Sequence, residues 1–155
     1  MPRYRLRIEY FGAPYLGWQS QTGGRTVQDA IERAIEKIDG GHRRITCAGR
    51  TDAGVHGLGQ VAHVDLVTAR REDVLRDALN AHLALASEQV AVLDVRAVPD
   101  EFDARFSALR RHYLYRIITR PARLALEDKR AWWVPKPLDH EAMHAAAQHL
   151  VGLHD

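Results

Sequence analysis

The sequence predicts an α+β fold in which strands and helices follow the order β-α-β-β-α-β. Residues 3–10 alternate apolar and charged side chains, the pattern of a strand with one buried face. Residues 27–39 repeat apolar side chains every three or four positions, which is typical of an amphipathic helix. Two strands, a helix and a strand follow. This order predicts a ferredoxin-like antiparallel sheet with both helices on one face.

Residues that favour turns and helix ends bound the first elements. The strand 3–10 is followed by a loop, 11–24, that is rich in glycine and aromatic residues. Thr26 is expected to cap the N-terminus of the helix 27–39, and Gly40 is expected to end it.

Two short strands, a second helix and a fourth strand are expected next. Residues 44–48 and 60–66 are predicted to pair like a hairpin around a glycine-rich loop, 49–59. Apolar spacing predicts a helix over 72–83, and residues 90–98 predict a strand. These elements complete the first unit.

The rest of the sequence predicts the start of a second, similar unit. Its expected elements are a strand, a short strand and a helix, over residues 112–119, 131–134 and 139–151. Asp139 is the expected N-cap of that helix. We therefore expect a ferredoxin-like catalytic domain over 1–104 and a second α+β domain over 105–155, which the sequence leaves incomplete.

Composition favours a globular protein without a membrane segment. The chain has 155 residues, of which 46% are hydrophobic and 27% charged. No run approaches the roughly 18 apolar residues of a membrane span. Cys47 is the single cysteine, so no intrachain disulfide can form, and its apolar surroundings predict a buried, inert thiol. We expect a soluble, cytoplasmic protein.

Arginine is concentrated between residues 105 and 123, although the formal net charge is only +2. That interval contains no Asp or Glu. The pattern is typical of a solvated face and equally of a footprint for a phosphate backbone. Strand 3–10 adds a second basic set. The arginines concerned are Arg105, Arg110, Arg111, Arg116, Arg120 and Arg123, with Arg3, Arg5 and Arg7.

The loop at 49–57, with the sequence GRTDAGVHG, places polar side chains among glycines between two apolar strands. One interpretation is a structural turn, because Asp and Gly favour turns. The other is a catalytic carboxylate at Asp52, because Arg50 would lie on the same side of an extended segment and keep the carboxylate ionised. The loop is expected to join the ends of two central strands, which would give such a group a rigid mount.

This loop, followed by GQV at 59–61, resembles the catalytic segment of the tRNA pseudouridine synthase A family. Other segments resemble the family in the same order and spacing, from about Arg3 to Asp155. They are YFG at 10–12, YLGWQSQ at 15–21, TVQ at 26–28, NA at 80–81, FDARFSA at 102–108 and RHYLYRI at 111–117. The resemblance implies the pseudouridine synthase fold.

The resemblance also implies a reaction, the isomerisation of uridine to pseudouridine at positions 38–40 in the anticodon stem-loop of tRNA, without metal or cofactor. Asp52 matches the catalytic carboxylate of the family. Arg50 matches an arginine implicated in flipping the base, and Tyr113 matches the residue that packs against the flipped uracil. A homodimer is expected as well. The candidates for contacts to the tRNA backbone are Arg105, Arg110 and Arg111.

The residues also leave other interpretations open. Tyr113 and Tyr115 alternate along a predicted strand, a pattern more typical of a core, and Trp18 is assigned to packing. The chain departs from the family pattern at Phe11, at Asp103 and over residues 84–89. Family members continue through a second half that supplies the other wall of the cleft and a basic partner for the carboxylate. A non-catalytic RNA-binding fragment is therefore one alternative.

Two further functions are each compatible with part of the sequence. The order β-α-β-β-α-β is shared with RNA-recognition domains, but those stack bases on aromatic residues of the third strand, and residues 60–66 contain none. A metal-dependent hydrolase would draw its ligands from closely spaced Asp and His side chains, yet no helical His-x-x-x-His framework accompanies them. Those side chains are Asp52, His56, His63 and Asp65.

Overall fold

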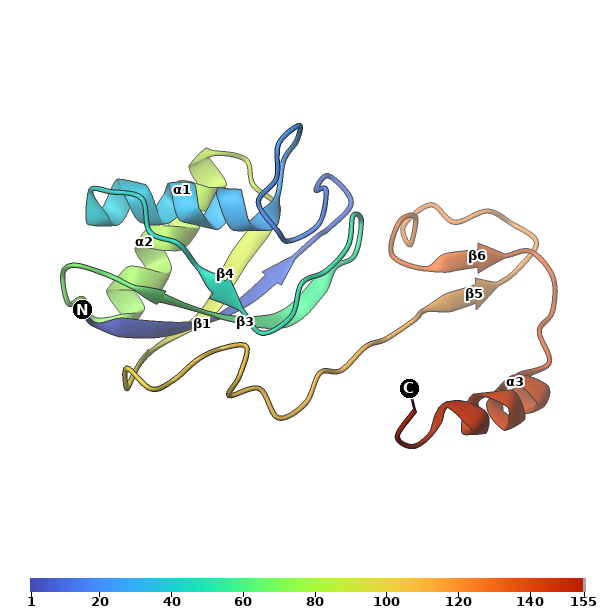
Figure 1. Cartoon of the computed structure of the whole chain (residues 1–155). Helices are drawn as coiled ribbons and strands as arrows, with labels where there is room; N and C mark the ends of the chain where they lie inside the picture. The colour runs from blue at the N-terminus through green and yellow to red at the C-terminus, as the bar shows by residue number, and fades with distance from the viewer. Residues whose placement is uncertain (155) are drawn as a thin grey trace. The chain divides into compact units, whose positions relative to one another are not determined.

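In the computed structural model, which describes residues 1–154, the chain forms two units (Figure 1). The first unit is Met1–His112, and the second begins at Tyr113. Within the described residues, no helix combines the length and apolarity needed to cross a membrane.

The first unit contains a four-stranded antiparallel sheet. Its strands are β1 (Arg3–Tyr10), β2 (Thr46–Cys47), β3 (Gly57–Asp65) and β4 (Val90–Val98). They lie in the order β2-β3-β1-β4, so β1 pairs with both β3 and β4 while β2 extends the sheet beyond β3. This is the strand order of a ferredoxin-like sheet, and the predicted fold class is confirmed.

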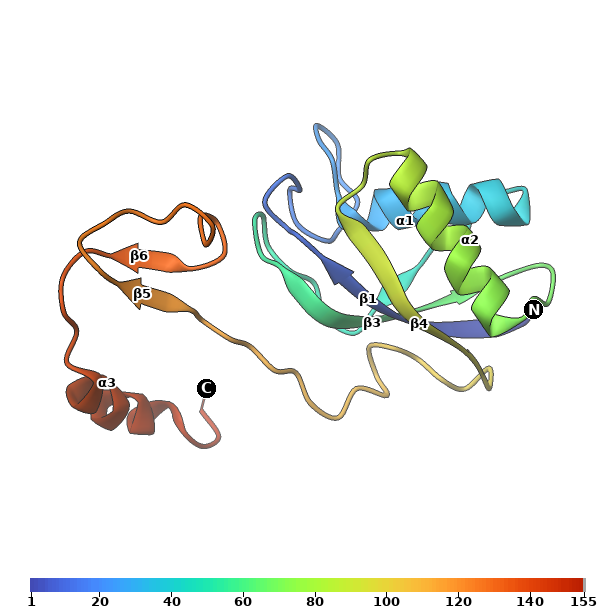
Figure 2. The same ribbon diagram turned by 180° about the vertical axis from the view of Figure 1, so that it is seen from behind.

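Two helices, α1 (Val27–Asp39) and α2 (Glu72–Leu85), cover one face of this sheet, as the two opposite views show (Figures 1 and 2). The Thr26 side chain accepts a hydrogen bond from the Asp29 N–H at the start of α1, and Gly40 ends the helix with φ 73°. Both predicted caps are therefore confirmed. The apolar face of β1 packs beneath the helices. The buried side chains of these three elements include Tyr4, Leu6, Ile8, Tyr10, Val27, Ile31, Ile35, Leu75, Leu79 and Leu83.

A side chain of α2 fixes that helix to β4. The Asn80 amide donates to the Val92 carbonyl at 2.9 Å and accepts from the Val92 N–H at 2.8 Å. The pairing of β1 with β4 shifts register next to this point, between Arg7 and Ile8. Asn80 thus satisfies both backbone groups of Val92, which costs less than leaving them unpaired. This contact accounts for an asparagine at a position that the sequence singled out.

The face of the sheet away from the helices is covered in part by the segment after β4. Arg3 binds the Asp65 carboxylate through two N–H groups at 2.7 Å, and a third N–H donates to the Phe102 carbonyl at 2.8 Å. The His63 ring accepts a hydrogen bond from the Ala104 N–H at 3.0 Å. Arg3 and His63 therefore hold this segment in place, which leaves little of Arg3 for a contact to RNA.

Two strands of the sheet differ in length from the prediction. Strand β3 begins at Gly57, three residues before the expected start at Gln60, because Gly57 pairs with Tyr10 at the end of β1. A Cβ atom at Gly57 would lie 2.4 Å from the Tyr10 ring, so only glycine allows the pairing to extend this far. Strand β2 is only Thr46–Cys47, shorter than the expected 44–48. It lies at the edge of the sheet, so the expectation that the Asp52 loop joins two central strands is wrong for β2.

The second unit contains two short parallel strands, β5 (Ile117–Thr119) and β6 (Trp132–Val134), and the helix α3 (His140–Ala147). Asp139 caps α3 as predicted, since its carboxylate accepts from the Ala142 N–H. The strand expected over 112–119 is wrong for its first five residues. Among the described residues, only Arg116 of these five has a backbone hydrogen bond to a neighbouring strand, from the Trp132 N–H at 2.8 Å, and a strand needs such partners along its length.

The helix expected over 139–151 is also shorter than predicted. It changes at its C-terminus into a turn of 3₁₀-helix, Gln148–Leu150. Tightening of the last helical turn in this way satisfies some of the carbonyl groups that a helix end leaves unpaired.

Candidate active site

Asp52 lies in the loop between β2 and β3, on the surface of the first unit. The loop is anchored at its base, where the Ala48 N–H donates to the Val61 carbonyl at 2.8 Å and the Gln60 amide donates to the Gly49 carbonyl. Its tip is a turn closed by a hydrogen bond from the Val55 N–H to the Asp52 carbonyl at 3.2 Å. Asp52 thus occupies the first position of a turn at the end of the sheet.

The loop 11–24 supports the Asp52 loop from its side. The Trp18 N–H donates to the Thr51 carbonyl at 2.9 Å, and the Gly54 N–H donates to the Tyr15 carbonyl at 3.3 Å. The Tyr10 hydroxyl and the Thr51 hydroxyl share a hydrogen bond of 2.8 Å. The residues on both sides of Asp52 are therefore held by partners outside their own loop.

Two glycines allow the loops to touch backbone to backbone. A Cβ atom at Gly12 would lie 2.0 Å from the Val55 carbonyl oxygen, and one at Gly17 would lie 2.5 Å from the Thr51 carbonyl oxygen. Gly17 also has φ 94°, in the left-handed region that side chains disfavour. Both belong to segments of the sequence that resemble the tRNA pseudouridine synthases, and the structure supplies the physical reason for glycine there.

The Asp52 carboxylate and the Arg50 guanidinium group do not form an ion pair or a hydrogen bond with each other. Neither group has such a partner anywhere in residues 1–154. The expected pairing of the Arg50 cation with the Asp52 carboxylate is therefore absent from the described part of the chain. Both side chains are exposed, so the carboxylate oxygens are open to a substrate.

The remaining predicted residues lie in two places. Tyr113 begins the second unit and is 70% exposed, while Tyr115 is 90% exposed, so the alternating tyrosines do not form a core.

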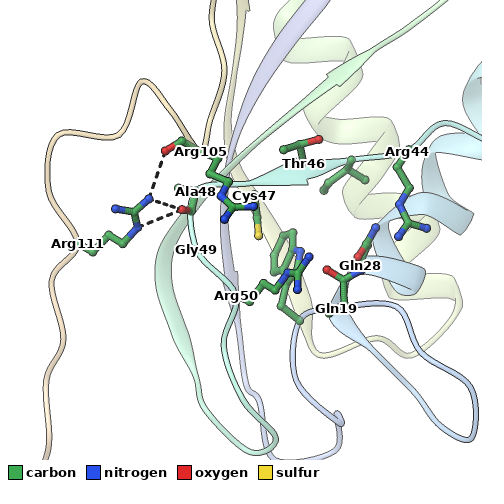
Figure 3. A pocket seen from close by; sticks show the side chains of 12 residues that line it. Gln19, Gln28, Arg44, Thr46, Cys47, Ala48, Gly49, Arg50, Arg105 and Arg111 are labelled. Carbon is green, nitrogen blue, oxygen red and sulfur yellow. Dashed lines mark hydrogen bonds between the residues drawn. The ribbon is translucent and has the colours of Figure 1, made fainter.

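Of the arginines predicted to contact the tRNA backbone, Arg110 is exposed. Arg111 instead donates twice to the Ala48 carbonyl, at 3.0 and 2.7 Å, and once to the Arg105 carbonyl at 3.2 Å (Figure 3). Arg111 therefore attaches the chain before Tyr113 to the strand end that leads into the Asp52 loop.

Two positions at which the sequence departs from the family pattern have structural partners. The Phe11 ring stacks on the His56 ring, with 4.7 Å between ring centroids. The Asp103 carboxylate accepts from the backbone N–H groups of Arg105 and Phe106, at 2.8 and 3.0 Å. The first contact joins the loop 11–24 to the Asp52 loop, and the second fixes the backbone at Arg105.

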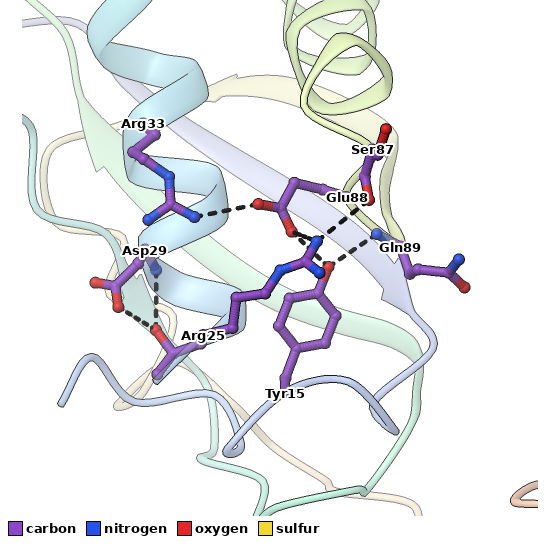
Figure 4. A network of polar contacts seen from close by, with 8 residues as sticks. Tyr15, Arg25, Asp29, Arg33, Ser87, Glu88 and Gln89 are labelled. Atoms are coloured by element: carbon purple, nitrogen blue, oxygen red, sulfur yellow. Dashed lines mark hydrogen bonds and ion pairs between the residues drawn. The ribbon is translucent and has the colours of Figure 1, made fainter. Parts of the chain in front are cut away.

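The third departure, residues 84–89, contains a cluster that the sequence did not predict. Glu88, whose side chain is 6% exposed, accepts from the Tyr15 hydroxyl at 2.8 Å, from Arg25 at 2.7 Å and from Arg33 at 3.1 Å (Figure 4). The Tyr15 oxygen in turn accepts from the Gln89 N–H at 2.8 Å. We call these five residues the Glu88 clamp. It joins the turn after α2 to the loop that supports Asp52.

Glu88→Gln should weaken the first unit in a manner that depends on pH. Burial raises the pKa of Glu88, but hydrogen bonds from Arg25 and Tyr15 outweigh it and bring the pKa below the ordinary 4.5. The carboxylate therefore stabilises the fold above pH 4.5, and this contribution is lost as the pH falls through the lowered pKa. We expect a loss of about 1–3 kcal/mol at pH 7 that shrinks below pH 4.5, measured by urea unfolding.

A matched control is Glu36→Gln, since Glu36 is exposed on α1 and its carboxylate forms no ion pair among residues 1–154. It should change the free energy of unfolding by less than about 0.5 kcal/mol at either pH. Equal destabilisation by Glu88→Gln at pH 7 and at pH 3 would contradict the role given to the ionised carboxylate.

Three side chains of the alternative metal site are engaged by other partners. His56 accepts from the Gly12 N–H at 2.9 Å, His63 accepts from Ala104, and Asp65 is bound by Arg3. In the part of the chain that the structure describes, no three His, Cys, Asp or Glu side chains converge as metal ligands would. The geometry therefore does not favour the metal-dependent hydrolase.

Comparison with known proteins decides the family. A protein family described as tRNA pseudouridine synthase matches residues 7–107, which include β1 from Arg7 onward, both helices of the first unit and the Asp52 loop. The chain belongs to the tRNA pseudouridine synthase family. The resemblance seen in the sequence is confirmed.

Curated relatives agree with this assignment. The chain is 64% identical over 155 residues to the tRNA pseudouridine synthase A of Sinorhizobium fredii, and the match covers 100% of the chain and 63% of that protein. It is 63% identical to the protein of the same description from Allorhizobium ampelinum, of which it covers 60%. For the Bartonella henselae protein the identity is 56%, over 63% of its length. The chain thus spans about three fifths of the length of these relatives.

Proposed function

We propose that this protein converts uridine to pseudouridine in the anticodon stem-loop of tRNA, with Asp52 as the catalytic carboxylate. The observation that carries the proposal is that the Asp52 carboxylate is exposed and has no structural partner among residues 1–154. It forms no hydrogen bond or ion pair within that range, on a loop whose backbone is held at Thr51 and Gly54. A group without a structural partner on a rigid support is suited to meet a substrate. Family membership supplies the reaction.

The reaction requires one bond to break and another to form on the same base. The C1′–N1 bond of uridine breaks, the uracil turns, and C5 joins C1′. The C5 proton leaves and N1 gains a proton, so atoms and charge balance. An ionised carboxylate is suited to attack at C1′, to addition to the base, or to removal of the 2′ proton, because both of its oxygens accept.

Base flipping is part of the proposal, because a base paired in a stem cannot reach Asp52. Extruding a nucleotide costs a few kcal/mol, and a side chain has to hold the opened space. Arg50 is suited to this step because its guanidinium group is exposed and has no partner in the described chain. Tyr113 is proposed to stack on the uracil, since an exposed ring offers a face to a base.

The finer assignments are proposed on the same basis. Arg105 and Arg110 are candidates for phosphate contacts, and Arg111 has N–H groups left for such a contact beside those bound to carbonyls. A homodimer, a cytoplasmic location and catalysis without a metal or cofactor are proposed from the family resemblance.

The proposal is tested by tritium release from tRNA that carries 5-³H-uridine. Formation of the C5–C1′ bond expels the label, so release of tritium in proportion to the target uridines is expected. A control tRNA with cytidine at the anticodon-stem positions should release none. Binding of the tRNA without release of tritium would contradict catalysis by this chain and would favour the RNA-binding alternative.

A further inference from the structure

A cavity lined by arginine lies beside the loop that carries Asp52 (Figure 3). It has a volume of about 420 Å³. Strand β2 and the first residues of the Asp52 loop form one wall, and Trp18, Gln19 and Gln28 contribute to another. No acidic residue is among those that line it. Its charged lining residues are Arg44, Arg50, Arg105 and Arg111.

Three of these guanidinium groups have N–H donors available to a ligand. Arg50 has no partner in residues 1–154. Arg105 lies over the Phe106 ring at 5.7 Å, a contact that does not use its N–H groups. The nearest acid to Arg44 is Glu32, at 3.9 Å, which is too far for a hydrogen bond, and the Arg44 side chain is 58% exposed. Arg111, in contrast, binds backbone carbonyls through its Nε and one terminal nitrogen, so only its other terminal nitrogen remains available.

The wall from which Arg44 emerges is rigid. The buried Glu32 carboxylate on α1 accepts from the Gln28 amide at 2.7 Å and from the Ile45 N–H at 3.0 Å. Gln28 also accepts from the Ser20 N–H at 3.0 Å. Because α1 and the start of β2 are joined by buried hydrogen bonds, the backbone beside Arg44 is fixed before any ligand binds.

We propose that this cavity binds a phosphodiester of the tRNA strand that contains the target uridine, with Arg44 and Arg105 as its ligands, while Arg50 at the cavity's edge keeps its role in base flipping. Arginine pairs with phosphate through two parallel N–H donors, and a rigid site without an acid favours an anion. The Cα atoms of Arg50 and Asp52 are at most about 7 Å apart, since two peptide units join them. A phosphate held here therefore belongs to a nucleotide close to Asp52. This inference rests on the proposed function.

Arg44→Gln tests the proposal through the salt dependence of tRNA binding. Each phosphate contact releases counterions, so its loss should lower the slope of log affinity against log salt concentration by about one. We expect the affinity for tRNA to fall about three- to tenfold at moderate salt. Arg44→Lys should restore the slope, because the charge returns, but only part of the affinity, because the two parallel donors do not.

The matched control is Arg76→Gln on α2, which removes the same charge from a partly exposed residue that pairs with Asp77 outside the cavity lining. It should leave the slope and the affinity nearly unchanged. Equal losses in the Arg44 and Arg76 variants would mean a general effect of charge and would overturn the proposal. A second arm titrates the wild type and Arg44→Gln with inorganic phosphate. Loss of phosphate binding with tRNA affinity unchanged would assign the cavity to a free anion and would also overturn it.

Failure of the proposed phosphate site can be distinguished from failure of the proposed catalytic function. If the wild type releases tritium from tRNA while Arg44→Gln binds tRNA with the wild-type slope, the isomerisation stands and the phosphate site fails. If the wild type binds tRNA through Arg44 without releasing tritium, the site stands and the catalytic assignment fails.

Discussion

Asp52→Asn is expected to reduce pseudouridine formation by at least about 10³-fold, the scale seen when a catalytic carboxylate or nucleophile is removed. The amide keeps the shape of the side chain but cannot act as an anionic nucleophile or base. Because the carboxylate has no partner within residues 1–154, the fold loses no contact. The free energy of unfolding should therefore change by less than about 0.5 kcal/mol. Single-turnover tritium release and urea unfolding measure the two quantities.

The control for this variant is Asp100→Asn, an exposed aspartate of the same unit that lies outside the Asp52 loop. It should keep full activity. Asp52→Asn should also still bind tRNA, which separates a lost reaction from a lost complex. Retention of activity in Asp52→Asn would rule out the carboxylate as the catalytic group, whatever the fate of the control.

Gly17→Ala should destabilise the first unit by about 2–5 kcal/mol and lower activity as well. The methyl group would stand 2.5 Å from the Thr51 carbonyl oxygen, and the residue has φ 94°. Strain at such a backbone angle costs about 1–3 kcal/mol, and overpacking adds a similar amount. Relief of the clash has to move Thr51, which is adjacent to Asp52. Urea unfolding and tritium release should thus both respond.

Gly23→Ala separates the effect of backbone strain from the effect of the steric clash. Gly23 has φ 97°, close to that of Gly17, but nothing lies within 4 Å of the position that its Cβ would take. Only the backbone strain, about 1–2 kcal/mol, is expected there, with activity preserved. Equal loss of activity in both variants would show that the contact between Gly17 and Thr51 does not position the Asp52 loop.

Local sequence patterns predicted the elements whose position depends on one hydrophobic periodicity or on one helix-capping residue. The alternation over residues 3–10 and the cap at Thr26 predicted β1 and the start of α1 correctly, because burial on one face and an unpaired helix N-terminus are local constraints. The Asp52 loop was found from its glycines and polar residues. Its surface position at the end of the sheet agrees with that prediction.

Features that depend on distant partners were not predictable from local patterns. Tyr113 and Tyr115 alternate like a strand, yet a strand forms only beside another, and β5 begins at Ile117. Glu88 lies in a segment without a motif, and its three donors come from positions 15, 25 and 33. The role of Arg111 was assigned from charge alone, whereas its contacts to Ala48 depend on how the chain returns to β2.

The only thiol group of the 155 residues lies in the wall of the arginine-lined cavity. It belongs to Cys47, which is 9% exposed, and burial raises the pKa of its thiol, which slows alkylation. Because the 155 residues contain one cysteine, any thiol reagent that modifies the protein reports on this position alone. The protein therefore carries an intrinsic chemical label in the cavity wall, whose rate of modification can follow occupancy without an engineered probe.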